Sequence, residues 1–234
     1  CEKLDASSFR FTIPAETLPG LYDLWAIGSN GVSAIRTFTI GRRAEQLEVE
    51  PNDSVSTAMP VPLDVVINGQ IDKAADADHF QFDAKRGQRV VIECCAERID
   101  SPLRAVLEVF NTSGRRQAVN RGYYGIDPLI DFSVPADGSY IVKVQDLVLS
   151  GSAEHYYRLD IDTGPRVAFS LPSVIERGKA SRIALYGWNL QEQNTRQTLS
   201  EVANVADSSS TALADVGKSA FDRVEIEIPA TLAE

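Results

Sequence analysis

Acidic side chains crowd one short segment of this chain, and their spacing suits a cation site. Within six residues the segment supplies four oxygen-bearing side chains, from Glu48, Glu50, Asn52 and Asp53. Calcium takes about six to eight hard oxygen ligands in flexible geometry. Glu48 and Glu50 fall on one side of an extended segment, and a turn at Pro51 lets the next two side chains converge on them. The segment therefore predicts that Ca²⁺ is a cofactor.

Two further acids, Asp76 and Asp78, begin a predicted strand that can approach this corner. They complete a candidate metal site made of Glu48, Glu50, Asn52, Asp53, Asp76 and Asp78. A purely structural interpretation is also open. Short polar side chains such as those of Asn52 and Asp53 commonly cap a turn, and the glutamates would then be solvated.

Reactive side chains are scattered, which argues against catalysis. His79 lies inside a predicted strand and His155 follows a Gly-Ser turn. Neither belongs to a His-Glu-x-x-His zinc pattern, and no Gly-x-Ser-x-Gly elbow marks a serine. The adjacent Cys94 and Cys95 are too strained to pair with each other, and Cys1 has no evident partner. We therefore expect no catalytic residue in this chain and no enzymatic activity of its own.

A glycine-flanked loop at residues 121–125 offers a second kind of site. It carries Tyr123 and Tyr124, and exposed tyrosines suit contact with a protein or a glycan. The alternative is that one tyrosine tucks onto the body of the domain. The loop predicts ligand binding through Tyr123 and Tyr124.

The charge balance limits the possible partners. The chain has 33 acidic and 23 basic side chains, a net charge of -10. This excludes nucleic acid and anionic membrane surfaces as expected partners. Apolar runs stay far shorter than the roughly 20 residues that span a bilayer. An extracellular protein or polysaccharide surface remains the expected partner.

Short strands separated by turns predict an all-β protein. Apolar and polar residues alternate in most segments, as in half-buried strands. In the middle of the chain the strands recur about every 8 to 12 residues, which is typical of a sandwich. The strands predicted for this antiparallel, jelly-roll-like β-sandwich are residues 65–71, 79–83, 89–96, 105–111, 129–134, 139–146 and 156–162.

Segments on either side of this sandwich predict further strands. Residues 42–50 read as a charged linker, and Gly164-Pro165 marks a second boundary. Residues 191–219 are polar, with a short helix or a loop as alternatives. The flanking strands are predicted at residues 9–13, 21–27, 32–40, 167–169, 174–175, 182–187 and 224–228.

An internal repeat links the two flanks. Residues 9–17 match residues 224–231 in alternation and in an Ile-Pro-Ala core. Two more strands follow the first copy, so residues 1–41 resemble the back half of a repeat domain and residues 165–234 the front half of the next. We expect the halves to complement each other, in one chain or between two. Chance alternation before a proline is the alternative.

The central region resembles the bacterial pre-peptidase C-terminal domain family. Order and spacing carry the resemblance, in residues 48–54, 68–71, 76–82, 85–88, 135–140 and 157–159. One departure is Arg104, where similar sequences often have an acid. The flanks resemble Ig-like repeats more weakly. The resulting domain prediction is an Ig-like back half at 1–44, a pre-peptidase C-terminal-like sandwich at 45–164 and an Ig-like front half at 165–234.

The resemblance implies a role beside catalysis rather than in it. Members commonly accompany secreted peptidases and include the collagen-binding domains of bacterial collagenases. In those domains an acidic segment of this kind holds calcium, which carries over to Glu48, Glu50, Asn52, Asp53 and Asp78, with Asp76 less closely matched. We expect an extracytoplasmic binding or spacer module of a larger bacterial protein. The alternative is a fragment of a secreted peptidase or other hydrolase whose catalytic domain lies outside this chain.

Overall fold

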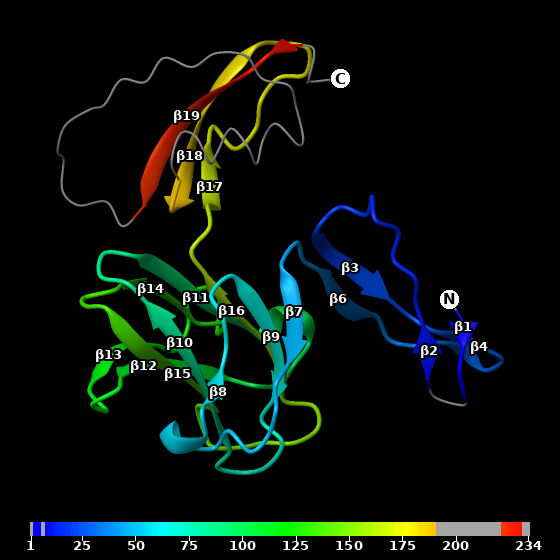
Figure 1. The fold of residues 1–234 in the computed structure, drawn as a ribbon. Helices are drawn as coiled ribbons and strands as arrows, with labels where there is room; N and C mark the ends of the chain where they lie inside the picture. The colour runs from blue at the N-terminus through cyan, green and yellow to red at the C-terminus, as the bar shows by residue number, and fades with distance from the viewer. Residues whose placement is uncertain (1, 6–7, 191–220, 231–234) are drawn as a thin grey trace.

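Nearly all the regular structure of this chain is β-strand (Figure 1). The computed structural model describes residues 2–5, 8–190 and 221–230. Two short 3-10 turns, η1 (Val55–Thr57) and η2 (Glu97–Ile99), interrupt the strands. The strands are β1 (Glu2–Lys3), β2 (Phe9–Arg10), β3 (Gly20–Leu24), β4 (Ile27–Gly28), β5 (Gly31–Val32), β6 (Arg36–Ile40), β7 (Ala44–Leu47), β8 (Met59–Pro60), β9 (Val65–Gln70), β10 (Ala77–Ala84), β11 (Arg89–Cys95), β12 (Ala105–Asn111), β13 (Arg116–Asn120), β14 (Leu129–Ser133), β15 (Gly138–Asp146), β16 (Tyr156–Asp162), β17 (Arg166–Leu171), β18 (Ser181–Trp188) and β19 (Asp222–Ile228).

Two five-stranded sheets form the central sandwich. Their strand orders are β13-β12-β15-β10-β8 and β14-β11-β16-β9-β7. The ladders are antiparallel except at one edge of each sheet, where β8 pairs with β10 and β7 pairs with β9 in parallel. The predicted all-β sandwich is therefore confirmed.

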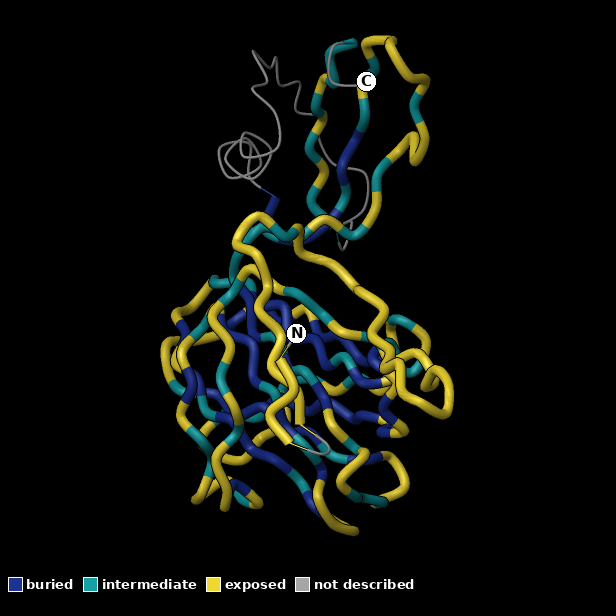
Figure 2. The backbone as a smooth tube through the Cα atoms, turned by 90° about the vertical axis from the view of Figure 1, so that its right-hand side faces the viewer, coloured by how far each residue is buried: buried dark blue, intermediate teal, exposed yellow. Residues whose placement is uncertain are grey.

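The core lies between these two sheets because side chains alternate along each strand. In β16, Tyr157, Leu159 and Ile161 are at most 1% exposed and belong to the core. In β11, Val90 and Ile92 point the same way. Figure 2 shows the buried residues concentrated in this body, while the flanking segments are largely exposed. The sandwich is thus the rigid part that positions any site.

Several short strands were not predicted from the sequence. Residues 42–50 are not only a linker, because β7 within them extends a sandwich sheet. β8 and β13 were also not predicted, whereas predicted residues 174–175 form no strand. Edge strands are held by main-chain hydrogen bonds on one side and need little apolar alternation. Such strands leave a weak signal in the sequence.

The flanking segments form smaller sheets. The N-terminal flank (residues 2–41) has three two-stranded sheets, β1-β2, β3-β6 and β4-β5, and the C-terminal flank (residues 165–190 and 221–230) has one sheet, β17-β18-β19. Within the described residues, no ladder joins one flank to the other. The expected helix or loop at 191–219 and the state of Cys1 fall outside those residues.

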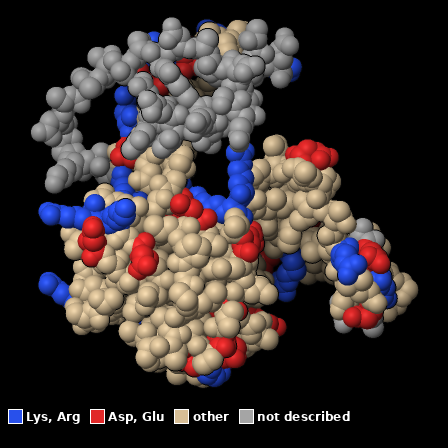
Figure 3. Space-filling view, in the orientation of Figure 1, with Lys and Arg blue, Asp and Glu red and all other residues tan. Residues whose placement is uncertain are grey.

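Ion pairs lie close to the points where the flanking segments leave the sandwich. Arg43 pairs with Asp160 and Asp162, and Arg166 pairs with Glu93. We call these five residues the seam. Figure 3 shows basic side chains where the sandwich meets the flanks. In the described part of the chain, no helix has the length and apolar character to cross a bilayer.

Candidate metal centre

The predicted acids converge at one end of the sandwich, as two overlapping groups. One group is Glu48, Glu50 and Asp78, and the other is Glu50, Asp53 and Asp76. Within each group, one ligand oxygen from every residue lies within 4.8 Å of the others. Figure 3 shows acidic side chains gathered at the lower end of the sandwich. Five of the six predicted ligands thus meet, and Glu50 is common to both groups.

Main-chain contacts with β9 hold the start of the acidic segment. The amide of Glu48 donates to the Asn68 carbonyl at 3.0 Å, which continues the β7–β9 pairing by one residue. In return, Glu48 Oε1 accepts a hydrogen bond from the Gln70 amide at 2.6 Å. The edge of β9 therefore holds the Glu48 carboxylate in place.

His79 fixes the other end of the segment. Its amide donates to the Asn52 carbonyl at 3.0 Å, and its Nδ1 lies 3.1 Å from the same oxygen. The Asn52 amide donates to Glu50 Oε2 at 2.9 Å. Sequence reasoning treated His79 as ordinary strand packing, and its role as the anchor of Asn52 was missed. The pair is separated by 26 intervening residues, so no local pattern could reveal it.

Two oxygens at this corner are buried without a hydrogen-bond partner. Asn52 and Asp78 are both 0% exposed. Among the described residues, Asn52 Oδ1 and Nδ2 and Asp78 Oδ1 have no partner. Buried polar atoms are nearly always satisfied in folded proteins, so an unmet oxygen beside several carboxylates is an unusual feature. The donor set of amide and carboxylate oxygens is the one that calcium takes, and the residues present fit that ion.

Burial makes the charges at this corner costly in the absence of a cation. Burial and the neighbouring Glu48 carboxylate raise the pKa of Asp78 to about 9. Burial also raises the pKa of Glu48. The Tyr157 hydroxyl lies between the two acids, donating to Asp78 Oδ2 and standing 3.0 Å from Glu48 Oε2. Without a cation, these surroundings therefore favour the protonated, uncharged form of Asp78 near neutral pH.

Gly69 makes the close approach of these groups possible. A Cβ atom at this position would lie 2.4 Å from the Tyr157 ring and 2.6 Å from Glu48 Oε2. Contacts under 3.0 Å are not seen for real Cβ atoms. A side chain at position 69 would displace Tyr157 or Glu48 from the corner.

A lysine occupies the outer group of acids. Lys73 Nζ lies 3.3 Å from Asp53, 3.4 Å from Asp72 and 3.5 Å from Asp76. Hydrogen bonding to Asp53 raises the pKa of Lys73. Asp76 is otherwise held by main-chain donors, since its carboxylate accepts from the amides of Asp72 and Ala77. The lysine thus supplies the nearest positive charge to this group.

The predicted tyrosine loop lies elsewhere, against the C-terminal flank. Tyr123 is 44% exposed, and its ring centroid is 5.9 Å from that of Trp188. Tyr124 is half-buried, with the Arg98 guanidinium 4.9 Å from its ring centroid. The tyrosines therefore pack where the C-terminal flank meets the sandwich, and Tyr123 remains partly exposed. Ligand binding by this pair stays a prediction.

His155, Cys94 and Cys95 lie outside the acidic corner and have structural surroundings. His155 Nδ1 lies 2.8 Å from Ser152 Oγ, and its Nε2 lies 3.1 Å from Ser150 Oγ. Ser150 Oγ in turn donates to Asp146 Oδ1. Cys94 and Cys95 are free, and burial raises the pKa of Cys95 to about 11. A thiol with so high a pKa is a poor nucleophile near neutral pH.

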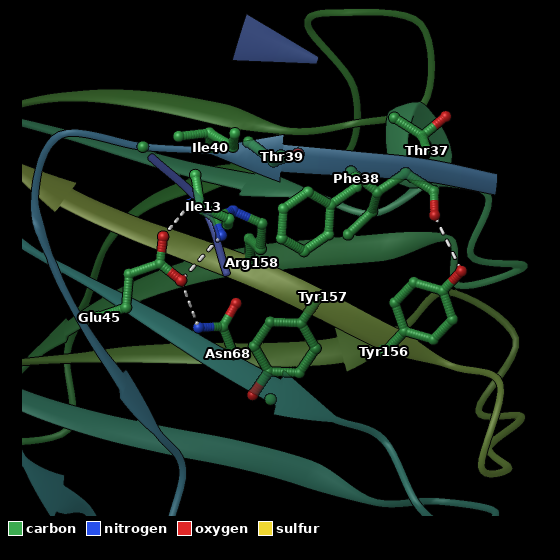
Figure 4. A pocket seen from close by; sticks show the side chains of 13 residues that line it. Ile13, Thr37, Phe38, Thr39, Ile40, Glu45, Asn68, Tyr156, Tyr157 and Arg158 are labelled. Carbon is green, nitrogen blue, oxygen red and sulfur yellow. Dashed lines mark hydrogen bonds and ion pairs between the residues drawn. The ribbon is translucent and has the colours of Figure 1, made fainter. Parts of the chain in front are cut away.

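A groove of about 510 Å³ lies between β6 and the outer face of the sandwich (Figure 4). Arg158 pairs with Glu45 at 2.9 Å, and Asn68 donates to the same carboxylate. The neighbouring Tyr156 also lines this groove. Tyr157, the residue between Tyr156 and Arg158, points its ring into the core and its hydroxyl to the acidic corner.

The fold and this corner define a class, an all-β sandwich with a cluster of acidic side chains at one end. No protein-family model matches the chain. Among curated proteins, a probable subtilase-type serine protease of Deinococcus radiodurans is 32% identical over 98 residues, covering 41% of this chain. The match spans 14% of the length of that protease.

Comparison with solved structures gives distant similarities. The pre-peptidase C-terminal domain of a collagenase from Bacillus anthracis aligns with a TM-score of 0.37 and 14% identity, over 52% of this chain and 100% of that domain. PliG of Aeromonas hydrophila, a periplasmic inhibitor of g-type lysozyme, aligns with a TM-score of 0.34 and 19% identity, over 51% of this chain and 100% of PliG.

Proposed function

We propose that this chain is a non-catalytic accessory module of an exported multidomain bacterial protein, and that Ca²⁺ stabilises its acidic corner. The sequence similarity to a stretch of a probable subtilase-type protease supports the accessory role. That stretch is 98 residues long, the size of a domain rather than of a motif. The module would present a rigid sandwich to an extracellular protein or polysaccharide, with Tyr123 and Tyr124 as candidate contacts.

The unmet oxygens of Asn52 and Asp78 carry the calcium proposal. Glu48, Glu50 and Asp78 would hold the ion from the inner group, with Asn52 Oδ1 beside them. Asp53 and Asp76 extend the same acidic surface outward. A bound cation would neutralise these carboxylates and satisfy buried oxygens that the protein leaves unpaired. The acidic segment and β10 would then be tied together at the end of the sandwich.

Thermal unfolding with and without calcium tests this proposal. A ligand that binds only the folded state adds about 2.7 kcal/mol at a concentration of 100 Kd, so millimolar Ca²⁺ should raise the melting temperature. Glu50→Ala and Asp53→Ala should reduce or abolish the rise. Asp83→Asn removes an exposed acid from the same strand as Asp78 and should leave it unchanged. A wild-type melting temperature that does not respond to millimolar Ca²⁺ would end the calcium proposal.

A second candidate is a segment of a secreted peptidase or other hydrolase, with catalysis outside this chain. The similarity to a probable subtilase-type serine protease favours it. A general protease assay separates the possibilities. Both candidates require the purified chain to be inactive on a labelled protein substrate, and turnover that survives repurification would overturn both. Cleavage by the longer parent protein would favour the second.

A further inference from the structure

The groove between β6 and the outer face of the sandwich has a floor made of β16 and β9. Side chains alternate along a strand. Because Tyr157 and Leu159 belong to the core, Tyr156 and Arg158 point outward into the groove. These two residues lie about 7 Å apart along the strand, and Asn68 of β9 is aligned with Arg158. The floor therefore has an aromatic ring at one end and polar groups at the other (Figure 4).

The strand β6 forms the opposite wall and brings a second ring. Phe38 is 43% exposed and Tyr156 is 36% exposed, and both line the groove. Hydrogen bonds hold this arrangement in place. The Thr37 amide donates to Asp100 Oδ2 at 2.7 Å, and the Tyr156 hydroxyl donates to the Ile99 carbonyl at 2.9 Å. The two rings are thus fixed yet accessible, so a ligand that stacks on them loses little freedom of the protein.

The polar end of the groove carries no net charge. Arg158 pairs with both oxygens of Glu45, at 3.0 and 2.9 Å, and Asn68 donates to the same carboxylate at 3.0 Å. Gly41 leaves room for this pair, because a Cβ atom there would lie 3.2 Å from Arg158 Nη2. A guanidinium has further N–H donors, and the Asn68 amide also has an oxygen that accepts. This end therefore offers hydrogen bonds in both directions without an unbalanced charge.

A sugar ring has the matching chemistry. A pyranose has an apolar C–H face that stacks on aromatic rings, and a rim of hydroxyl groups that both donate and accept hydrogen bonds. A polyanion would be repelled by the net charge of -10. Peptides are commonly bound by pairing with a free strand edge, whereas both floor strands are paired on two sides. A volume of about 510 Å³ lies within the usual range of small-ligand sites.

We propose that this groove binds a neutral polysaccharide. Phe38 and Tyr156 stack on its sugar rings, while Asn68 and Arg158 bond its hydroxyl groups. The inference rests on the accessory role proposed above, and it names the class of ligand and a contact surface apart from the tyrosine loop. The calcium and protease tests contain no sugar, so a failure of sugar binding is distinguishable from a failure of that role.

Isothermal titration calorimetry with neutral hexasaccharides tests the ligand class. The probes are cellohexaose, chitohexaose, maltohexaose and xylohexaose, with the acidic hyaluronan hexasaccharide for comparison. At least one neutral probe should bind the wild-type chain, and the acidic probe should bind more weakly than it does. Failure of all the neutral probes to bind at millimolar concentration overturns the proposal. A preference for the acidic probe over every neutral one overturns it as well.

Substitutions of the two rings locate the site. Phe38→Ala and Tyr156→Ala should each weaken binding about tenfold, which corresponds to about 1.4 kcal/mol. Phe169→Ala and Tyr123→Ala are the matched controls, since these rings are 42% and 44% exposed and lie outside the groove. Both controls should bind like the wild type. Tyr156→Phe keeps the ring and should also bind like the wild type, which separates loss of stacking from loss of folding.

The contrary results point to other sites or other ligands. Affinity that is unchanged in both Phe38→Ala and Tyr156→Ala overturns the proposal, because the sugar must then lie elsewhere. Loss of binding in Tyr123→Ala alone would assign the sugar to the tyrosine loop instead. A tryptic digest of casein tests a peptide ligand. Casein peptides that bind the wild type but not Tyr156→Ala, while no hexasaccharide binds, would assign the groove to peptides and overturn the polysaccharide.

Discussion

Asp78 decides how the acidic corner responds to pH. Its pKa, raised to about 9 by burial and by Glu48, compares with 3.8 for an ordinary aspartate. Between these values the folded protein holds a proton that the unfolded chain releases. Because the folded state then binds more protons, the free energy of unfolding falls as pH rises through this range. Without calcium, this group destabilises the protein most at alkaline pH.

Replacing Asp78 by Asn should therefore have opposite effects with and without the ion. In EGTA, Asp78→Asn should be more stable than the wild type at pH 8 to 9, with a flatter dependence on pH. In millimolar Ca²⁺, the variant should lose the calcium-dependent stabilisation. Urea unfolding from pH 5 to 9, with Asp83→Asn as control, measures both effects. An unchanged pH dependence in EGTA would show that Asp78 is ionised in the free protein.

Lys73 competes with a cation for the outer acids. Its ammonium lies 3.3 Å from Asp53 and 3.5 Å from Asp76, so a bound ion would meet a like charge there. We expect Lys73→Met to tighten calcium binding about tenfold, which corresponds to about 1.4 kcal/mol. Isothermal titration calorimetry measures the change. Lys85→Met, an exposed lysine in a different loop, is the control, and equal affinity in both variants would place the ion in the inner group alone.

At the scale of the strands, alternation predicted most of the sandwich. β11, β12, β15 and β16 each bury every second residue in the core, and their predicted ranges agree closely with the structure. β7 could not be found in this way, because its four residues, Ala44–Leu47, do not alternate between apolar and polar. Its pairing is a property of β9, which offers a free edge. The register of an edge strand depends on its neighbour rather than on its own composition.

The candidate site was likewise predicted from the sequence only in part. Clustered acids in one segment predicted that a cation site existed, and five of them do converge. The burial of Asn52 depends on His79 in β10, and the position of Glu48 depends on Tyr157 in β16. Both partners come from strands distant in sequence. Local spacing therefore indicates the chemistry, while the sheet order supplies the geometry.

Trp188 should decide whether the C-terminal flank stays on the sandwich. It is 1% exposed and packs with Val91 and Leu129, two residues on the outer face of the sandwich sheet. Truncating a buried Trp to Ala typically costs about 3 to 5 kcal/mol. We expect Trp188→Ala to release the flank while the sandwich core persists.

Limited proteolysis tests this expectation. Cleavage between the sandwich and β17 should accelerate strongly in Trp188→Ala, leaving a resistant fragment that contains the core. Val167→Ala, an exposed apolar residue of the same flank, should cleave at the wild-type rate. Loss of the resistant fragment as well would mean that the flank and the sandwich unfold as one unit.

On the scale of the whole molecule, the sandwich lies between two smaller β-segments. The N-terminal flank contacts it through the Thr37 amide, which donates to Asp100, and the C-terminal flank packs Trp188 on the outer face of one sheet. The acidic corner lies at the opposite end of the strands from the seam.

The order of strands at the sandwich edge also determines the route that mechanical force takes. Ala44 at the start of β7 and Ile161 near the end of β16 are both aligned with Val65, so the chain enters and leaves at the same end. Tension applied through the two flanks would load the ion pairs of Arg43 with Asp160 and Asp162 first. The far end of the strands, where the acids meet, is bypassed by that load. A chain pulled from its two flanks would therefore lose the Arg43 ion pairs before the acidic corner is disturbed.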